Sequence, residues 1–310
     1  MIVAVISGKG GTGKTTLATA LALAWSREAP LTLADSDVEG PNAYRYLPGL
    51  DERESRPVQV DFPEIDATLC HLCGACAALC RFGALVPLRE KIHFVSSQCH
   101  ACGGCGLVCP SGAISTRPHA MGKIRRASSE RVTFFEGVLD IGESRATPVV
   151  DALLDAACEA SAAGGDLILD GPPGASCAVA AVVQAAEICL LVAEPTPFGL
   201  HDLEQVHALV ALRAKPSVVV LNRSRGGEED TQVERWCAAH GLPLVMRIPH
   251  TRAVAAAYAA GRPPLELLPG IEERLVALRA RLAEQLAREV RGAWATGDSF
   301  HGARANGSRR

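Results

Sequence analysis

The chain has 310 residues, of which 48% are hydrophobic and 21% charged, and its formal net charge is −3. This composition supports one large or two ordinary folded domains and excludes a disordered chain. The near-neutral charge gives no reason to expect nucleic acid, and no apolar run approaches the ~20 residues of a membrane span, so we expect neither partner. The chain enters an apolar strand without a basic export segment, and we therefore expect a cytoplasmic protein.

The first predicted element is a buried strand at residues 2–6, which leads into Gly-Lys-Gly-Gly-Thr-Gly-Lys-Thr at residues 8–15. This segment fits the phosphate-binding pattern G-x-x-x-x-G-K-[ST], which lies between a strand and a helix. Backbone N–H groups of the loop, together with the N-terminus of a helix expected at residues 14–28, would bind phosphate oxygens. Lys14 would reach the β- and γ-phosphates, and the Thr15 hydroxyl would bind Mg²⁺.

The same glycines also satisfy G-x-G-x-x-G, the pattern of dinucleotide sites, with Asp35 following about 20 residues later. A dinucleotide site does not require Lys14 and Thr15, whereas a triphosphate site does. We therefore favour a nucleoside triphosphate. Lys9, a second lysine inside the loop, is explained by neither pattern.

Carboxylates follow two further predicted strands. Asp35 and Asp37 come after a strand at residues 31–34 and, being two residues apart, point to the same side. Asp170 ends a buried strand at residues 166–170 and precedes a Gly-Pro-Pro-Gly turn, which is a Walker B arrangement. Each carboxylate has an alternative role in capping a turn or helix. The phosphate loop favours Mg²⁺ binding and water positioning instead.

A cysteine-rich repeat interrupts the α/β pattern after a charged linker expected at residues 51–57. Eight of the twelve cysteines lie between residues 70 and 109, and residues 70–85 reappear at 99–114 with an offset of 29. Metal ligation is the expected use of such cysteines in a reducing compartment. Each copy reads C-x₂-C-x₂-C-x₃-C, the spacing of two-cluster ferredoxins, whereas a zinc ribbon needs only two C-x₂-C pairs. The repeat predicts two [4Fe–4S] clusters.

The fourth cysteine of each copy ligates the other cluster in such ferredoxins. The expected ligands of the first cluster are Cys70, Cys73, Cys76 and Cys109. Those of the second cluster are Cys80, Cys99, Cys102 and Cys105. Arg81 replaces the usual proline after the fourth cysteine of the first copy, which we expect to tune one cluster without preventing ligation.

The α/β pattern resumes after about residue 120. We expect strands at 131–139, 188–193, 217–221 and 244–248, and helices at 148–163 and 271–290. The last helix carries an apolar stripe with mixed charges, which favours packing against the domain or a subunit over a lipid surface. Residues 292–310 are rich in Gly, Ala, Ser and Arg, and we expect a disordered tail there. Isolated cysteines read as buried small residues, and a redox role remains open for Cys177 alone.

Taken together, these motifs resemble the MinD/ParA/nitrogenase-iron-protein superfamily. The resemblance rests on the deviant Walker A segment 9–16, the Asp35/Asp37 pair, Asp170 with its Gly-Pro-Pro-Gly turn, and the segments 194–202 and 219–223. MinD-type ATPases with an inserted ferredoxin domain are the nearest resemblance. This resemblance implies an α/β fold with a mostly parallel, doubly wound P-loop NTPase sheet of the SIMIBI type over residues 1–58 and 120–291. An α+β domain like bacterial 2[4Fe–4S] ferredoxins would occupy residues 59–119.

The resemblance also implies roles for individual residues. Lys9 would reach the partner's phosphates across a homodimer, and Asp37 would orient the attacking water. The Mg²⁺ ligands implied are Thr15, Asp35 and Asp170. The ATP-binding residues implied are Gly10, Gly11, Thr12, Gly13, Lys14, Thr15, Thr16, Asn222 and Pro249.

Three functions are consistent with these features. In the first, a nucleotide-switched dimer that binds and hydrolyses Mg-ATP gates electron transfer through two [4Fe–4S] clusters to a redox partner. In the second, the protein assembles or carries clusters for an accepting protein, although the C-x₂-C pair of cluster-carrier relatives is missing from the C-terminal half. In the third, it is a redox-sensing positioning or regulatory ATPase. We favour the first.

Overall fold

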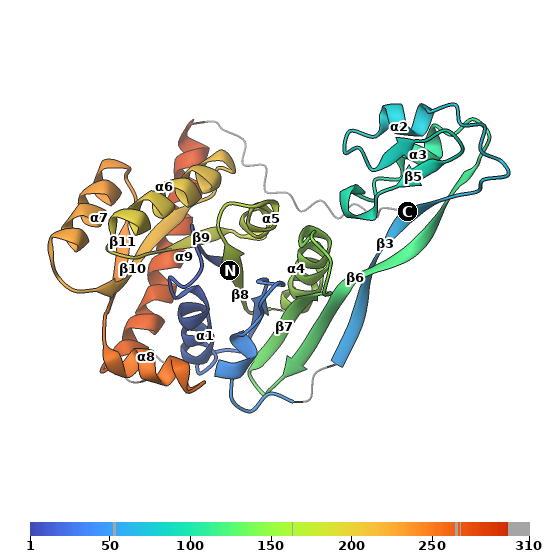
Figure 1. The fold of residues 1–310 in the computed structure, drawn as a ribbon. Helices are drawn as coiled ribbons and strands as arrows, with labels where there is room; N and C mark the ends of the chain where they lie inside the picture. Colours follow the sequence, from blue (N-terminus) through green and yellow to red (C-terminus); the bar gives the residue numbers. More distant parts are fainter. Residues whose placement is uncertain (52–53, 163, 264–265, 267, 297–310) are drawn as a thin grey trace.

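The computed structural model describes residues 1–51, 54–162, 164–263, 266 and 268–296 (Figure 1). Its main feature is a nine-stranded sheet in the order β11-β10-β9-β1-β8-β2-β7-β6-β3. The first seven strands in this order are parallel. They are β11 (Leu244–Pro249), β10 (Ser217–Ser224), β9 (Ile188–Ala193), β1 (Ile2–Ser7), β8 (Asp166–Pro173), β2 (Leu31–Asp35) and β7 (Val132–Leu139). The predicted mostly parallel α/β sheet is confirmed.

Helices cover both faces of this sheet, because alternate residues of each buried strand point to opposite sides. Ala4 and Ile6 of β1 pack in one core, and Val3 and Val5 pack in the other. The first core is covered by α4 (Thr147–Ser161), α5 (Cys177–Ala185), α6 (Pro197–Leu212) and α7 (Glu228–Ala239). The second is covered by α1 (Lys14–Trp25), α8 (Arg252–Ala259) and α9 (Ile271–Thr296). The sheet therefore has apolar layers on both sides, as a doubly wound sheet requires.

Two long antiparallel strands, β3 (Glu54–Ile65) and β6 (Ile114–Ser128), extend the sheet beyond β7. The linker expected at residues 51–57 is wrong in part, because β3 already begins at Glu54. Only the C-terminal part of β6, residues 122–128, pairs with β7. Residues 59–65 of β3 and 114–121 of β6 project from the sheet as a two-stranded arm (Figure 1). The expected limits of the insertion, residues 59 and 119, lie near the base of this arm.

Residues 66–113 form a lobe at the end of the arm (Figure 1), which we call the cysteine lobe. Its elements are short: α2 (Ala75–Leu79), β4 (Leu85–Pro87), β5 (Ile92–Phe94), the 3₁₀ helix η2 (Ser96–Gln98) and α3 (Gly104–Leu107). The sequence repeat is also a backbone repeat. Leu72 and Ala101, which are equivalent in the two copies, both have a left-handed φ, of 57° and 51°.

The ends of two helices differ from expectation. α1 ends at Trp25, three residues before the expected limit, and α9 continues to Thr296, past residue 292, where we expected a disordered tail. The rest of that expected tail, residues 297–310, lies outside the described residues. Among the described helices, none combines the length and the apolar character needed to cross a membrane.

Candidate functional site

The loop between β1 and α1 is held by a buried network of polar side chains. Thr12 Oγ1 donates to Ser7 Oγ (2.7 Å), and Ser7 Oγ donates to the Lys9 carbonyl (2.7 Å). Lys14 Nζ donates to Ser7 Oγ (3.0 Å) and to the Lys9 carbonyl (3.2 Å). These bonds fix the loop around the start of α1, whose first N–H groups have no intrahelical acceptor. The loop is thus preorganised to bind an anion.

Gly13, the last residue of the loop, has to be glycine for two reasons. Its φ is 96°, and a Cβ placed there would lie 2.3 Å from Nδ2 of Asn222. That nitrogen donates to the Thr12 carbonyl (2.7 Å), while Asn222 Oδ1 accepts from the Arg223 N–H (2.9 Å). The Asn222 amide therefore supports the loop, and its reading of an adenine edge stays a prediction.

The three predicted carboxylates lie at the carboxyl ends of β2 and β8. Asp170 is fully buried, and neither of its oxygens has a hydrogen-bond partner in the described part of the chain. Asp35 differs, because its oxygens accept from the N–H groups of Asp37 (3.1 Å), Asn42 (2.8 Å) and Ala43 (2.9 Å). Asp35 thus orders the segment after β2, whereas Asp170 is left with unused acceptors.

The pKa values of these groups are shifted chiefly by burial. Burial first, and the charge of Asp35 second, hold the pKa of Asp170 well above its usual range. Burial raises the pKa of Asp35 to about 7 and also raises that of Asp37. Burial lowers the pKa of Lys14, although Asp170 and Asp37 act to raise it. Buried carboxylates need a compensating cation, and oxygen ligands suit Mg²⁺. The unpartnered Asp170 oxygens, close to Thr15, therefore fit a magnesium ion.

A pocket of about 330 Å³ opens over the loop. The predicted residues that line it are Gly10, Gly11, Gly13, Lys14, Thr15, Thr16, Asp37, Asn222 and Pro249. The structure therefore brings together the phosphate loop, the segment after β2 and the carboxyl-terminal parts of β10 and β11, which are far apart in the sequence. The predicted residues Thr12, Asp35 and Asp170 are buried and do not line the pocket.

Further pocket residues were not predicted from the sequence. The Arg223 guanidinium donates to the Gly11 carbonyl (2.8 Å) and forms an ion pair with Glu194 (2.8 Å). Its left-handed φ of 56° directs the chain at the end of β10, and no local motif signals this. The other wall is α8, where Tyr258 lines the pocket and stacks on Tyr46, with ring centroids 5.2 Å apart. The only sequence signal for α8 was its position after the last predicted strand.

Lys9 is oriented away from the pocket of its own chain. Its Nζ lies 3.7 Å from the Asp202 carboxylate on α6, and its side chain is 41% exposed. Lys9 is absent from the pocket lining, unlike Lys14. The loop thus has one lysine, Lys14, that lines the pocket and one, Lys9, that faces out.

The eight cysteines of the lobe border two cavities. Cys70, Cys73, Cys76 and Cys109 line a cavity of about 20 Å³. Cys80, Cys99, Cys102 and Cys105 line a second cavity of about 300 Å³, which Cys76 also borders. In the described part of the chain, no three His, Cys, Asp or Glu side chains are grouped closely enough for a single metal ion. The lobe therefore divides its thiols between two sites without forming a single-ion centre.

The thiols within each cavity influence one another. Burial chiefly raises the pKa of Cys76, and the nearby Cys70 and Cys109 thiols add to this rise. Burial likewise raises the pKa of Cys105, with a smaller contribution from Cys99 and Cys102.

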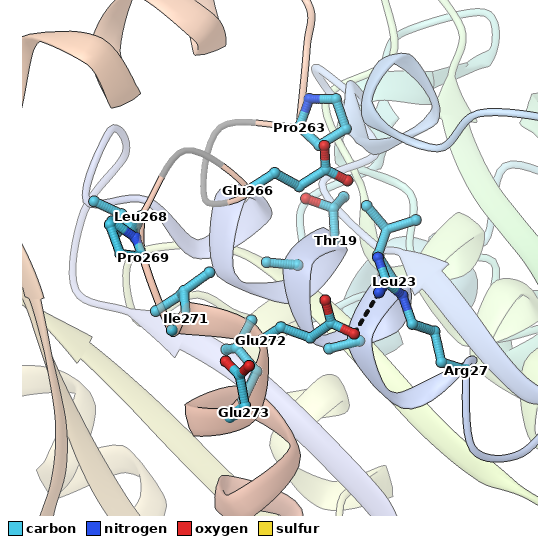
Figure 2. Close-up of a pocket in the computed structure, with 14 residues that line it drawn as sticks. Thr19, Leu23, Arg27, Pro263, Glu266, Leu268, Pro269, Ile271, Glu272 and Glu273 are labelled. Atoms are coloured by element: carbon cyan, nitrogen blue, oxygen red, sulfur yellow. Dashed lines mark ion pairs between the residues drawn. The ribbon is translucent and has the colours of Figure 1, made fainter.

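A further cavity of about 450 Å³ lies between α1 and the beginning of α9 (Figure 2). Leu23 and Ile271 line it, and an ion pair between Arg27 and Glu272 (2.5 Å) crosses one side. None of the predicted site residues contributes to this cavity, so it is separate from the phosphate loop.

Of the isolated cysteines, Cys189 and Cys237 are buried and Cys158 is partly buried, as expected for small apolar residues. Cys177 is exposed at the first position of α5. Its redox role stays an open prediction.

Comparisons with known proteins place these features in context. A family model described as CobQ/CobB/MinD/ParA nucleotide binding domain matches residues 3–265. The chain is 31% identical over 228 residues to the uncharacterized protein MJ0579 of Methanocaldococcus jannaschii. The aligned residues cover 72% of this chain and 80% of that protein.

Solved structures with the same fold include two from this group. The septum site-determining protein MinD of Pyrococcus horikoshii, complexed with Mg-ADP, has a TM-score of 0.52 and 18% identity, with 96% of this chain and 98% of that chain covered. A ParA family ATPase of Chlorobium tepidum has a TM-score of 0.54 and 16% identity, with 89% and 97% covered. At these identities the likeness establishes the fold.

Proposed function

Because the chain belongs to the CobQ/CobB/MinD/ParA nucleotide-binding domain family, we propose that it is an ATPase that binds Mg-ATP over the phosphate loop. The observation that carries this proposal is the pocket itself, which is lined by Lys14 and Thr15 and also by Pro249 and Tyr258. The first pair suits phosphates, and the second pair offers apolar surface for a base. The Mg-ADP in the Pyrococcus horikoshii relative supports the same ligand class.

The chain supplies the groups that ATP hydrolysis needs. Thr15, Asp35 and Asp170 would hold Mg²⁺, which neutralises charge on the β- and γ-phosphates when bound. Lys14 binds phosphate oxygens, and Asp37, which lines the pocket, orients the attacking water. The burial of Asp170 and Lys14 excludes bulk water from the charged part of the site.

The active unit is a homodimer with a shared site. Lys9 is exposed and lies outside the pocket of its own chain, so its ammonium is available to a second chain. A lysine supplied in this way neutralises transition-state charge, as an arginine finger does.

The cysteine lobe, over the proposed insertion 59–119, binds two [4Fe–4S] clusters. Support comes from the two cavities, since each is lined by the four cysteines expected for one cluster, while Cys76 borders the second cavity as well. The four cysteine ligands of a cluster lie farther apart than the ligands of a single metal ion. The lack of a single-ion centre among the described residues is therefore compatible with a cluster site. The first cavity is small, and its thiols must spread to admit a cluster. Each cluster supplies one-electron chemistry when bound.

The function that combines these sites is nucleotide-gated electron transfer to a partner protein. The lobe is carried by β3 and β6, and β3 is the next strand of the chain after β2 and the Asp35–Asp37 segment, which supports a link between the switch and the redox module. Anaerobic purification of the full chain, followed by iron and sulfide analysis and an ATPase assay, tests the two activities separately. We expect roughly eight iron atoms per chain and Mg²⁺-dependent hydrolysis. A pure, folded chain without iron, or without hydrolysis, contradicts the corresponding half of the proposal.

Cluster delivery is a second candidate, favoured by one observation. Cys73 and Cys102, the second cysteines of the two repeats, are exposed, so an accepting protein could reach both cavities. Transfer of iron-labelled clusters to an apo-acceptor, dependent on hydrolysis, supports this function. Clusters that stay on the chain through repeated turnover support electron transfer.

A further inference from the structure

The arm meets the main sheet at a β-bulge. Val58 pairs with Gly122, but Gln59 pairs with Ala120, so Met121 is an extra residue in β6. The ladder between β6 and β7 also ends at Gly122, and beyond it the arm consists of β3 and β6. A bulge bends a strand pair and sets its direction. The direction of the arm is therefore determined next to Met121.

The loop that follows β7, residues 140–146, holds the arm at this bulge. The Asp140 N–H donates to the Met121 carbonyl (3.0 Å). His119 Nε2 lies 2.6 Å from Glu143 Oε1, and since a carboxylate only accepts, the imidazole donates. The Arg145 guanidinium lies over the Phe62 ring, 5.3 Å from its centroid. We call Phe62, His119, Glu143 and Arg145 the clasp.

On its outer side the clasp contacts the second cysteine cavity. Phe62 is 1% exposed and stacks on His119, with ring centroids 4.3 Å apart and an angle of 11° between the rings. The same ring packs with Ala84 and Cys99, which line that cavity. A movement of His119 therefore displaces a side chain that belongs to the same apolar cluster as Cys99, an expected cluster ligand.

On its inner side the clasp is connected to the nucleotide pocket. The Leu139 N–H, at the end of β7, donates to the Val38 carbonyl (2.8 Å). A Cβ on Gly137 would lie 2.5 Å from Val38 Cγ1, so β7 packs closely against the turn that follows β2. Val38 follows Asp37, which lines the pocket. Closely packed segments do not move independently, so a shift at Asp37 is passed to the clasp loop.

We propose that the clasp transmits the nucleotide state of the phosphate site to the second cysteine cavity. The loss of the γ-phosphate changes what Asp37 contacts, and the shift passes through Val38 and the end of β7 to Glu143 and His119. The clasp then changes the position of Phe62 relative to Cys99, and it changes the direction of the arm. This inference rests on the proposed function, and its residues act as positioning residues, since none of them lines the nucleotide pocket.

Hydrogen exchange of the anaerobically purified full chain tests the clasp. Peptides from the arm and from residues 80–101 are compared with ADP and with a non-hydrolysable ATP analogue, both with Mg²⁺. The wild type is expected to show exchange rates that differ about fivefold or more between the two nucleotides. His119→Phe keeps the ring stacking on Phe62 but removes the hydrogen-bond donor to Glu143. We expect this variant to show the same exchange rates with both nucleotides. Glu143→Gln keeps an acceptor and retains the difference.

Control variants and parallel measurements distinguish a failure of this inference from misfolding and from a failure of the proposed function. Arg117→Ala changes an exposed residue of the same arm outside the clasp and retains the difference. Glu143→Ala repeats the test from the other partner if His119→Phe does not fold. A wild type without a nucleotide-dependent difference, or a His119→Phe variant that keeps it, overturns the inference. Hydrolysis and iron content, measured on the same samples, report on the proposed function independently.

Discussion

The phosphate site and the cysteine lobe are stabilised in different ways. The strands that carry the phosphate site are buried on both faces, so their packing holds the loop whether or not ligand is present. The lobe has two small apolar clusters, and eight of the twelve exposed large hydrophobic side chains among the described residues belong to it. They are Leu69, Leu72, Leu79, Phe82, Val86, Leu88, Leu107 and Val108. A segment of this size with so small a core needs a further source of stability, which the proposed clusters would supply.

The largest expected effect is the loss of the lobe structure when iron is removed. Anaerobic chelation should expose the backbone of residues 66–113 to rapid hydrogen exchange, because in the proposed function metal–thiolate bonds take the place of an apolar core there. Strands β1, β8 and β9 should keep their protection. Exchange measured by mass spectrometry checks both regions in one sample. A lobe that stays protected without iron would remove the contrast between the two regions.

The next largest effect is expected in the hydrolysis rate of Lys9→Ala. Removal of a charge supplied to the transition state costs roughly 10³-fold in kcat, while ATP binding should change little. The matched control is Lys91→Ala, which removes an exposed lysine of the lobe.

Mixed dimers test whether Lys9 acts across subunits. Lys9→Ala and Asp37→Ala chains are each inactive alone. Together they should regain hydrolysis, because one of the two shared sites then combines an intact Asp37 with an intact Lys9 from the partner. A mixture as inactive as its components places Lys9 within its own chain.

Lys14→Ala should weaken ATP binding by about 100-fold, because charge-assisted hydrogen bonds to phosphate are lost and buried Asp170 loses its nearest cation. Calorimetric titration with ATP measures the effect, and the lobe should keep its iron. Iron loss in this variant would indicate that the two regions fold as one unit.

Arg223→Ala should weaken ATP binding by about tenfold, because the hydrogen bond from Arg223 to the Gly11 carbonyl orients one part of the loop. The effect is limited because the hydrogen bond from Asn222 to the Thr12 carbonyl remains. Arg223→Lys should restore little, because lysine lacks the planar fork that contacts Gly11 and Glu194 together. Equal KM values for the wild type and both variants would rule out a role for Arg223 at the loop.

The sequence predicted best the elements whose signals are local. The parallel strands appear as short apolar runs before loops, and β1, β2, β7, β8, β9, β10 and β11 all lie at predicted positions. β3 and β6 were missed because their exposed residues lack an apolar pattern, and because Pro57, Pro63 and Pro118 argue against strands. Proline is tolerated there since one side of such a ribbon faces solvent.

The same distinction applies to the site. The loop residues, the carboxylates and the cysteine sets follow from spacing, and the structure brings most of them to common cavities. Arg223 and the clasp were not predictable, because their partners are remote. Arg223 contacts Gly11 across 212 positions, and His119 contacts Glu143 through a loop whose course depends on the sheet order. Such contacts require the fold before they can be inferred.

The central claim is that nucleotide controls the redox lobe, and a redox titration followed by electron paramagnetic resonance tests it most directly. The full chain, anaerobically purified, is titrated with Mg-ADP and with Mg²⁺ plus a non-hydrolysable ATP analogue. We expect the signals of two [4Fe–4S] clusters and a midpoint potential, for at least the cluster beside Cys99, that differs between the nucleotides. Two clusters with identical potentials in both states would contradict nucleotide control, and the absence of cluster signals would contradict the redox lobe itself.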